Sequence, residues 1–347
     1  MMIYFLIVII SFLNVVLLLR LIIWFSKKYK YYDRNDPLKS KNQNISRLGG
    51  IGLFLAFIMV FIFFIQDLDE SPGHSFYIAI SLLFFLGLYD DVFDVKAYVK
   101  FIIQILIAAL VVTQGQVKYA AFIFDSLALN TLTGNLFTVL LLVYVVNAFN
   151  LIDGIDGLAA MLGLVINLFL GLALALDGDL LYAVMAFVLF STLCGFLLFN
   201  FPPAKIFMGD TGAMVIGFIS AVVALRYIEL NREVFNTIYT ASVLVIALFI
   251  IPLYDTVRVF FIRLRLKRSP FIGDQNHIHH RLRRLGLQDY QIVLLLTFYT
   301  LLMVFAVMLL HDAGDAYLCV MLLITCILFN TVLDYQLRKR VASAKLI

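Results

Sequence analysis

The stretch Val139–Leu176 reads VLLLVYVVNAFNLIDGIDGLAAMLGLVINLFLGLALAL, two apolar runs with a short polar segment between them. The second run, residues 158–176, approaches the ~20 residues that a helix needs to cross the hydrocarbon core of a bilayer, and the first is the end of a longer apolar run that centres near Leu141. Continuous rather than alternating hydrophobicity favours helices over a barrel, because a backbone in lipid must satisfy its own hydrogen bonds. The stretch therefore predicts two membrane-spanning helices joined by a polar turn.

The rest of the chain repeats this pattern. Of its 347 residues, 63% are hydrophobic and 14% are charged, and the mean hydropathy is +1.02. We predict an all-α, polytopic integral membrane bundle of about eleven transmembrane helices, forming a single integrated domain over residues 1–347 with no soluble domain. The predicted spans centre near Val15, Ala56, Leu83, Leu106, Leu141, Leu164, Val188, Gly217, Leu248, Thr300 and Leu323.

Two further features fit this membrane class. The first apolar run, Ile3–Phe25, is too long for the apolar part of a signal peptide and lacks its basic start, so we expect it to be retained. The three cysteines all fall within apolar runs, which favours small core residues over a disulfide framework or a thiolate metal site.

Lysine and arginine are unevenly distributed over the connections. They gather in the first connection, in the connection after the ninth span and in the C-terminal tail, whereas the intervening loops are poor in them or acidic. The positive-inside rule then predicts the N-terminus outside and the C-terminus in the cytoplasm. With that orientation, four polar clusters, at residues 90–94, 147–156, 208–212 and 277–280, all face the cytoplasm. Such a gathering of acids, amides and imidazoles on one face indicates a polar site.

The first cluster contains paired acids. Asp90 and Asp94 are four residues apart and would share a helix face, with Asp91 turned about 100° away. Paired acids at a helix end can hold a divalent cation or act as a base on a phosphate or water. Solvation at a membrane edge explains them equally well, although Lys96 and Lys100, one and two turns on, favour function.

The second cluster, NAFNLIDGIDGL, is more specific. Asn147 and Asn150 lie at the end of an apolar run, where burying an amide is costly unless it has a partner. Asp153 and Asp156 supply hard oxygen ligands, and the glycines that follow them allow close approach of a ligand to the backbone. A structural explanation, with Asp156 capping the next helix, accounts for one acid and the glycines but leaves the two amides unexplained.

The third cluster, NFPPAKIFMGDTG at residues 200–212, precedes the predicted span near Gly217. An N-cap role explains Asp210 or Thr211. A helix start with glycines and a lysine also suits a phosphate, and an aspartate there would need a cation between itself and that phosphate.

The fourth cluster contains His277, His279 and His280, with Arg281 directly after them. Zinc is the first ligand to consider, but no cysteine is near and HxHH is a poor tetrahedral set. Imidazoles beside arginines suit a pyrophosphate, and a general-acid role stays open. The arginines that precede the cluster also fit a positive-inside anchor against anionic lipid.

One acid, Asp255, lies near the cytoplasmic end of the predicted ninth span. Asp255 and Arg258 are three residues apart, which favours a local ion pair. Pro252 predicts a kink in the same helix.

The chain resembles the polyprenyl-phosphate N-acetylhexosamine-1-phosphate transferases over residues 46–285, in five motifs that occur in order: SRLGG, GLYDDVFDVKAYVKF, NAFNLIDGIDGL, AKIFMGDTGA and RSPFIGDQNHIHHRL. That group includes the bacterial enzyme that charges undecaprenyl phosphate with GlcNAc-1-phosphate. The phospho-MurNAc-pentapeptide transferases are more distant relatives, and HIHHRL favours the UDP-HexNAc branch.

The resemblance implies a reaction and a setting. A HexNAc-1-phosphate, most commonly of GlcNAc, would pass from a UDP-HexNAc to undecaprenyl phosphate with release of UMP. This step would initiate a cell-surface polysaccharide such as the lipopolysaccharide O-antigen, in cell wall biogenesis. The enzyme would use Mg²⁺, or Mn²⁺ in its place, at the cytoplasmic face of the bacterial inner membrane. A homodimer is compatible with the resemblance, and nucleic acid is not an expected partner.

The resemblance also implies roles for individual residues. Asp210 matches the magnesium-coordinating aspartate, and Asp90 and Asp91 match paired catalytic acids that serve the polyprenyl phosphate. Asp153 and Asp156 match a catalytic loop at the metal and the sugar nucleotide. Substrate contacts are implied for Asn147, Asn150, Asn200, Phe207, Lys100, His277, His279, His280 and Arg281. Of these, the aromatic ring would stack on uracil and the histidines would lie near the diphosphate.

Two other classes of membrane protein share some of these features. A membrane transporter with a cytoplasm-facing acidic site is the alternative from another class, since intramembrane acids often mark ion paths. It predicts polar groups near mid-span and an internal repeat, whereas the acids here lie at span ends and no repeat is visible. A CDP-alcohol phosphotransferase needs DGxxAR followed by GxxxDxxxD, and Asp153-Gly154 is not followed by such a pattern.

Overall fold

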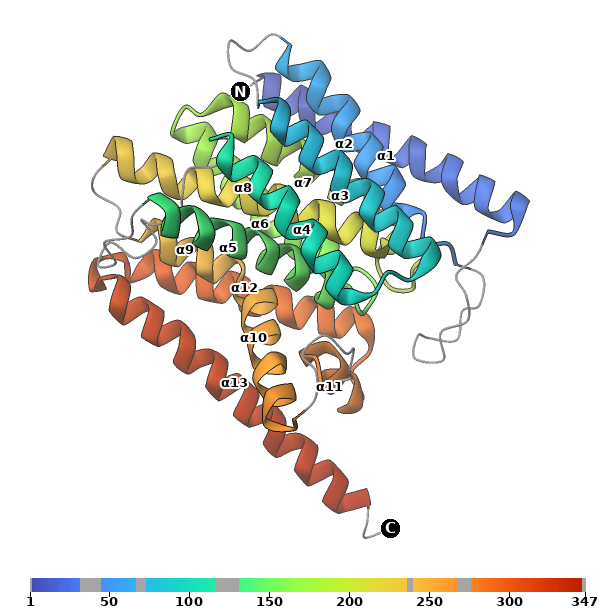
Figure 1. Ribbon diagram of the computed structural model, residues 1–347. Coiled ribbons are helices and arrows are strands. Elements are labelled where there is room, and N and C mark those ends of the chain that lie inside the picture. Colours follow the sequence, from blue (N-terminus) through green and yellow to red (C-terminus); the bar gives the residue numbers. More distant parts are fainter. Residues whose placement is uncertain are drawn as a thin grey trace. The chain divides into compact units, whose positions relative to one another are not determined.

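The computed structural model describes residues 2–31, 45–66, 73–115, 131–235, 240–267 and 276–344. Every regular element in these ranges is helical (Figure 1), which confirms the predicted all-α class. The helices are α1 (Met2–Tyr29), α2 (Gly49–Ile65), α3 (His74–Phe93), α4 (Ala97–Thr113), α5 (Thr131–Ile152), α6 (Leu158–Leu176), α7 (Leu180–Asn200), α8 (Gly209–Phe235), α9 (Ala241–Leu248), α10 (Ile250–Arg265), α11 (Ile278–Arg284), α12 (Asp289–Leu309) and α13 (Asp315–Ala344), with a 3₁₀ turn η2 (His311–Ala313). Most of the basic first connection, and residues 268–275 of the last motif, lie outside the described residues.

The described helices are those of a multi-pass membrane protein. Eight of them are long and apolar enough to cross a membrane, and the bent pair α9 and α10 makes nine if it counts as one span. Helices α2 and α4 are apolar but shorter. Each predicted span centre falls within one of these helices, so the polytopic bundle is confirmed. The number of spans and their orientation stay predictions.

The chain divides into two compact units, Met1–Leu230 and Asn231–Ile347. In the first unit, α1 contacts α2 and α7, α6 contacts α5 and α7, and α4 lies against α3 and α5. Burial distinguishes the helices of this unit: 89% of the apolar window of α8 is buried, against 22% for α1. Helix α8 is therefore an inner helix, on which the neighbouring helices converge.

Glycines allow the close approach of these neighbours to α8. A Cβ added at Gly87 in α3 would lie 2.5 Å from the Cα of Thr211, which is backbone and cannot move aside. In α8 itself, a Cβ added at Gly217 would lie 3.0 Å from the Cβ of Phe149 in α5. Small residues at helix contacts are the usual means of tight packing in a membrane, where the hydrophobic effect does not drive helices together.

Charged side chains fix the other end of α8. The Nε of Arg226 lies 2.6 Å from the Oδ2 of Asp179, and the Oδ1 of Asp179 caps α7 by accepting from the backbone N–H of Tyr182 at 3.1 Å. Glu229 lies 3.3 Å from the same guanidinium. This partly buried group ties α8 to the start of α7, away from the polar residues at the N-terminus of α8.

The second unit contains the predicted kink. Helices α9 and α10 meet at Phe249 with a bend of 72° (Figure 1). Pro252 has no N–H with which to donate to the carbonyl of Leu248, so the bond that would continue the helix is missing. Around this bend, α12 contacts α9, α10 and α11, and α13 contacts α9 and α11.

Candidate active site

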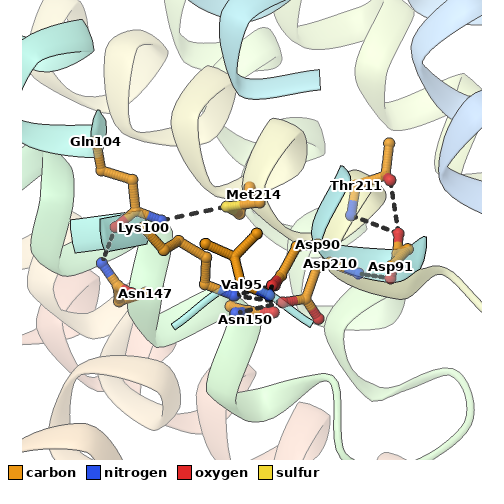
Figure 2. Close-up of polar contacts among 10 residues, drawn as sticks. All are labelled: Asp90, Asp91, Val95, Lys100, Gln104, Asn147, Asn150, Asp210, Thr211 and Met214. Atoms are coloured by element: carbon orange, nitrogen blue, oxygen red, sulfur yellow. Dashed lines mark hydrogen bonds and ion pairs between the residues drawn. The ribbon is translucent and has the colours of Figure 1, made fainter. Parts of the chain in front are cut away.

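Polar side chains of the first unit gather where four apolar helices begin or end. Asp90 lies in the last turn of α3 and Lys100 in the first turn of α4. Asn150 lies in the last turn of α5, and Asp210 is the second residue of α8. The structure brings these side chains together at one end of the unit (Figure 2). The three polar clusters that the sequence places in this unit therefore meet.

The ammonium of Lys100 lies between two carboxylates. Its Nζ is 2.5 Å from the Oδ2 of Asp90 and also pairs with the Oδ2 of Asp210 (Figure 2). Asn150 donates from Nδ2 to that same oxygen of Asp210 at 3.2 Å, and the Oδ1 of Asp90 accepts from the backbone N–H of Val95 at 2.7 Å. The side chain of Asp210 is 34% exposed, against 9% for Asp90. Of these two carboxylates, Asp210 is therefore the one that a ligand can reach more easily.

Asp91 has a different position from its neighbour. Its Oδ1 accepts from the backbone N–H of Asp210 at 2.8 Å, and its Oδ2 accepts from the N–H and the hydroxyl of Thr211 at 3.0 and 2.6 Å (Figure 2). These contacts cap the start of α8 from another helix. Gly209, at φ 70°, leaves room for the cap, because an added Cβ would lie 2.5 Å from the Oδ2 of Asp91. The carboxylate of Asp91 thus fixes the helix end that carries Asp210.

Asp94 does not share the helix face of Asp90 that its spacing predicts. The helix ends first: Asp94 is the C-cap of α3, with φ 53° and an exposed side chain. That expectation was wrong because the four-residue spacing places two residues on one face only while both remain helical.

Asn147 lies one turn before Asn150 in α5 and has a partner inside the protein. Its Nδ2 donates to the Oε1 of Gln104 at 2.6 Å, and the Nε2 of Gln104 donates to the sulfur of Met214 at 3.2 Å (Figure 2). Gln104 is one turn from Lys100 on α4. This pair of amides therefore holds α4 against α5 where Lys100 must reach the carboxylates. Sequence reasoning missed Gln104, and the only signal was a lone amide within an apolar run.

Two loops of the first unit are tied together by Asn200 and Asp156. The amide of Asn200 accepts from the backbone N–H of Gly157 at 3.0 Å and donates to the carbonyl of Ile206 at 2.9 Å. The Oδ2 of Asp156 accepts from the backbone N–H of Ala204 at 3.1 Å. Asn200 is 2% exposed, so its amide shapes the loops that surround the site.

The backbone of Phe207 is held on both sides. Its N–H donates to the carbonyl of Ser46 at 2.8 Å, and its carbonyl accepts from the N–H of Gly49 at 3.0 Å. This contact gives the SRLGG motif a structural purpose. The side chains of Phe207 and of Asp153, just past the end of α5, are both partly exposed and can meet a ligand.

The oxygen donors at this site suit a magnesium ion. Mg²⁺ in proteins is usually held by one or two carboxylates, with phosphate oxygens and water completing its octahedron. Asp90 and Asp210 supply two carboxylates, and the bridging ammonium of Lys100 shows that positive charge fits between them. Within the described ranges, no three or more His, Cys, Asp or Glu side chains are arranged to hold a metal. A magnesium ion here would therefore take its remaining ligands from amides, substrate and water.

The histidines belong to the second unit. The Nδ1 of His277 lies 2.8 Å from the Oδ2 of Asp255 in α10, and the rings of His277 and His279 stack with centroids 5.7 Å apart. The ring of His280 follows, 4.2 Å from that of His279. Burial, and then the neighbouring His280, lower the pKa of His279 well below its ordinary value, so its imidazole is neutral at pH 7. Neither of its ring nitrogens has a hydrogen-bond partner among the described residues.

Arg281 turns toward α13. Its guanidinium donates to the Oδ1 of Asn330 and pairs with Asp334. Arg283, on the same short helix, pairs with Asp289 of α12 at 2.6 and 2.9 Å. The predicted phosphate-binding arginine therefore already has partners, and sequence reasoning did not identify Asn330 or Asp334.

Comparison with known proteins gives consistent matches. Residues 74–228, from the start of α3 into α8, match the family model of glycosyl transferase family 4. These residues include the whole of the group around Lys100.

Individual relatives extend the match beyond this region. Decaprenyl-phosphate N-acetylglucosaminephosphotransferase of Mycobacterium leprae is 34% identical over 277 residues, which cover 72% of this chain and 69% of the relative. The probable undecaprenyl-phosphate N-acetylglucosaminyl 1-phosphate transferase of Bacillus subtilis is 30% identical, covering 83% and 79%. Undecaprenyl-phosphate alpha-N-acetylglucosaminyl 1-phosphate transferase of Escherichia coli K12 is 30% identical, covering 78% and 74%.

Proposed function

Because this chain belongs to the polyprenyl-phosphate N-acetylhexosamine-1-phosphate transferases of glycosyl transferase family 4, we propose that it transfers HexNAc-1-phosphate from a UDP-HexNAc to undecaprenyl phosphate. The observation that carries the proposal is the meeting of Asp90, Lys100, Asn150 and Asp210 at one end of an apolar bundle. A water-soluble sugar nucleotide and a lipid phosphate can both reach such a place.

The proposed reaction is a phosphoryl transfer. An oxygen of the lipid phosphate attacks the β-phosphorus that carries the sugar, the bond from that phosphorus to the UMP oxygen breaks, and UMP leaves. Polyprenyl-diphospho-HexNAc is the product. Because both reactants are anionic, catalysis of this kind depends on positioning and on neutralising the charge of the transferring oxygens.

The residues of the site have distinct proposed roles. The ammonium of Lys100 neutralises phosphate oxygens, and Asp90 takes any proton from the attacking lipid phosphate. Asn150 orients the carboxylate of Asp210, to which it donates at 3.2 Å. Asp91 acts on the reaction by fixing the start of α8.

Magnesium is the proposed cofactor, with Mn²⁺ as an alternative. Asp210 would hold the ion, since it is the more exposed carboxylate, with Asp90 and Asn150 nearby. When bound, Mg²⁺ would offset the charge that develops on the phosphate oxygens.

The nucleotide contacts are assigned by the resemblance. The partly exposed ring of Phe207 would stack on uracil, and Asp153 and Asp156 would serve the sugar nucleotide. Asn147 and Asn200 support the site through the contacts described above. The histidines and Arg281 are assigned to the diphosphate on the resemblance alone.

GlcNAc is the proposed sugar, because the names of the relatives specify N-acetylglucosamine. The product would initiate a cell-surface polysaccharide, such as an O-antigen, at the cytoplasmic face of the bacterial inner membrane. Among the described residues of the first unit, Asp90, Lys100 and Asp210 lie at helix ends rather than at mid-span, which favours the transferase over a transporter.

Purified protein in detergent, with undecaprenyl phosphate, Mg²⁺ and a panel of UDP-HexNAc donors, tests this proposal through release of UMP. We expect release that needs lipid, metal and one donor, with UDP-GlcNAc preferred. Folded protein that releases no UMP with any donor would contradict the proposal. Release that does not need lipid would indicate simple hydrolysis and would contradict it too.

A further inference from the structure

Helix α10 anchors the start of α11 through the backbone. The Oδ1 of Asp255 accepts from the N–H of Ile278 at 3.0 Å, and Arg258 donates to the carbonyl of Asn276. The two α10 side chains also pair with each other at 2.8 Å. These contacts hold the residues on both sides of His277 and would anchor the segment by themselves.

Asp255 makes one more contact, which anchoring does not require. Its second oxygen, Oδ2, lies 2.8 Å from the Nδ1 of His277. A local ion pair, which the sequence predicts, explains Arg258 but gives no reason for a histidine that is 22 residues away in the chain.

We propose that Asp255 is a positioning residue that acts through His277. A carboxylate accepts a hydrogen bond from Nδ1–H, so Nδ1 keeps its proton and Nε2 is left as the nitrogen that faces the substrate. Nε2 donates a hydrogen bond to a substrate oxygen when the ring takes up its second proton there. The inference deepens the proposed function and rests on it, because the substrate group in question is a phosphate oxygen of the sugar nucleotide.

Burial strengthens the effect of Asp255 on the imidazole of His277. The side chains of Asp255, His277 and Arg258 are 3%, 6% and 8% exposed. Water therefore competes little for hydrogen bonds to the imidazole. The bond to Asp255 is then the interaction that determines which ring nitrogen keeps the proton. The ring of His279 stacks on that of His277 with 8° between the planes, which limits rotation of the imidazole away from Asp255.

The first test determines, in the protein without substitutions, which ring nitrogen of His277 carries the proton. The chain has five histidines, so ¹⁵N-histidine labelling gives few signals, and His277→Gln identifies the signals of His277 by their loss. In the neutral form we expect the proton on Nδ1 and a bare Nε2. A neutral form with its proton on Nε2 would overturn the proposal, whatever the activity of the enzyme.

The second test is a double-mutant cycle on UMP release. We expect Asp255→Asn to lower kcat/KM by about 10- to 100-fold, the range known for removing the carboxylate partner of a metal-bound histidine. In the His277→Gln background the same change should cost less than about 2-fold, because the two residues act as one unit. Equal losses in both backgrounds would make Asp255 a purely structural anchor.

A matched control separates tautomer control from anchoring. Asp289 also pairs with a residue of α11, through Arg283, but contacts no imidazole. Asp289→Asn should stay within about 2-fold of its parent in both backgrounds. If Asp255→Asn does not fold, Asp255→Glu takes the place of that variant in the cycle, because glutamate keeps the charge that faces Arg258. Wild-type protein that releases no UMP would contradict the proposed function, while the labelling test still decides the pairing.

Discussion

At the scale of single residues, the site separates neighbours that look equivalent in the sequence. Asp90 contacts Lys100, whereas Asp91 caps α8. Asn150 meets a carboxylate of the same group, whereas Asn147 meets Gln104. Each pair thus combines one residue that can face the reacting groups with one that holds a helix in place.

The two adjacent acids should therefore respond differently to the same substitution. Asp90→Asn should lower kcat for UMP release by about 10²-fold or more, the range for loss of a general base, with little change in thermal stability. Asp91→Asn should lower both, because weakening a helix cap costs about 1 kcal/mol. Asp94→Asn is the matched control: the residue is exposed and its left-handed conformation suits asparagine, so activity and stability should be unchanged. Equal thermal midpoints for the variants at Asp90 and Asp91 would contradict the distinction.

Asp210 is the residue that we propose holds the magnesium ion. Asp210→Asn should abolish turnover with Mg²⁺ while the protein remains folded and inserted, because the amide keeps the shape of the side chain but lacks the charge that attracts the ion. Turnover and the thermal midpoint with and without Mg²⁺ are the measurements. Activity near that of the wild type would show that the ion is held elsewhere.

At the scale of helices, the N-terminus of α8 depends on close contact with its neighbours. The Cα of Gly87 faces the backbone of Thr211, the residue directly after Asp210. A shift of α3 would therefore also move the cap that Asp91 provides. Helix packing and the candidate site are coupled at this contact, because the first turn of α8 both packs against α3 and carries Asp210.

Gly87→Ala should both destabilise the protein and lower its activity. The added Cβ would lie 2.5 Å from the Cα of Thr211, and overpacking of this kind costs about 1–3 kcal/mol. Thermal unfolding in detergent and UMP release are the measurements. Gly171→Ala is the control, since its Cβ would meet only side chains, at 3.2–3.3 Å, and should cost less in both. A variant at Gly87 with wild-type activity would contradict the coupling of packing to the site.

At the scale of the whole molecule, the chain forms two compact units, and its orientation in the membrane is a prediction from the sequence. The basic connections predict the C-terminal end of α13 in the cytoplasm and its N-terminal end outside. Asp312, before α13, and Ala342, near its C-terminal end, are both exposed.

Cysteine labelling of intact cells tests this orientation. In a protein whose three native cysteines are replaced, a membrane-impermeant maleimide should label Asp312→Cys and should label Ala342→Cys only after the cells are opened. The physical reason is the cost of moving basic residues across the membrane. Labelling of Ala342→Cys in intact cells would contradict the predicted orientation.

The sequence by itself determined the helical class, the positions of the apolar helices and the ends at which polar residues gather. The reason is that the length and continuity of an apolar run are local properties, and the bilayer imposes them directly. The kink before Pro252 followed in the same way, from a missing N–H. The motifs were also sufficient to identify the family.

Only the tertiary structure decided which polar residue meets which. Lys100 and Asp210 are 110 residues apart, and Asp91 and Asp210 are 119 apart. The partners Gln104 of Asn147 and Asp255 of His277 had no local signal strong enough to identify them. Such contacts depend on how separate helices pack, and neither apolar periodicity nor residue spacing specifies that packing. The sequence therefore located the polar clusters, and the packing of the helices determined which of their residues meet.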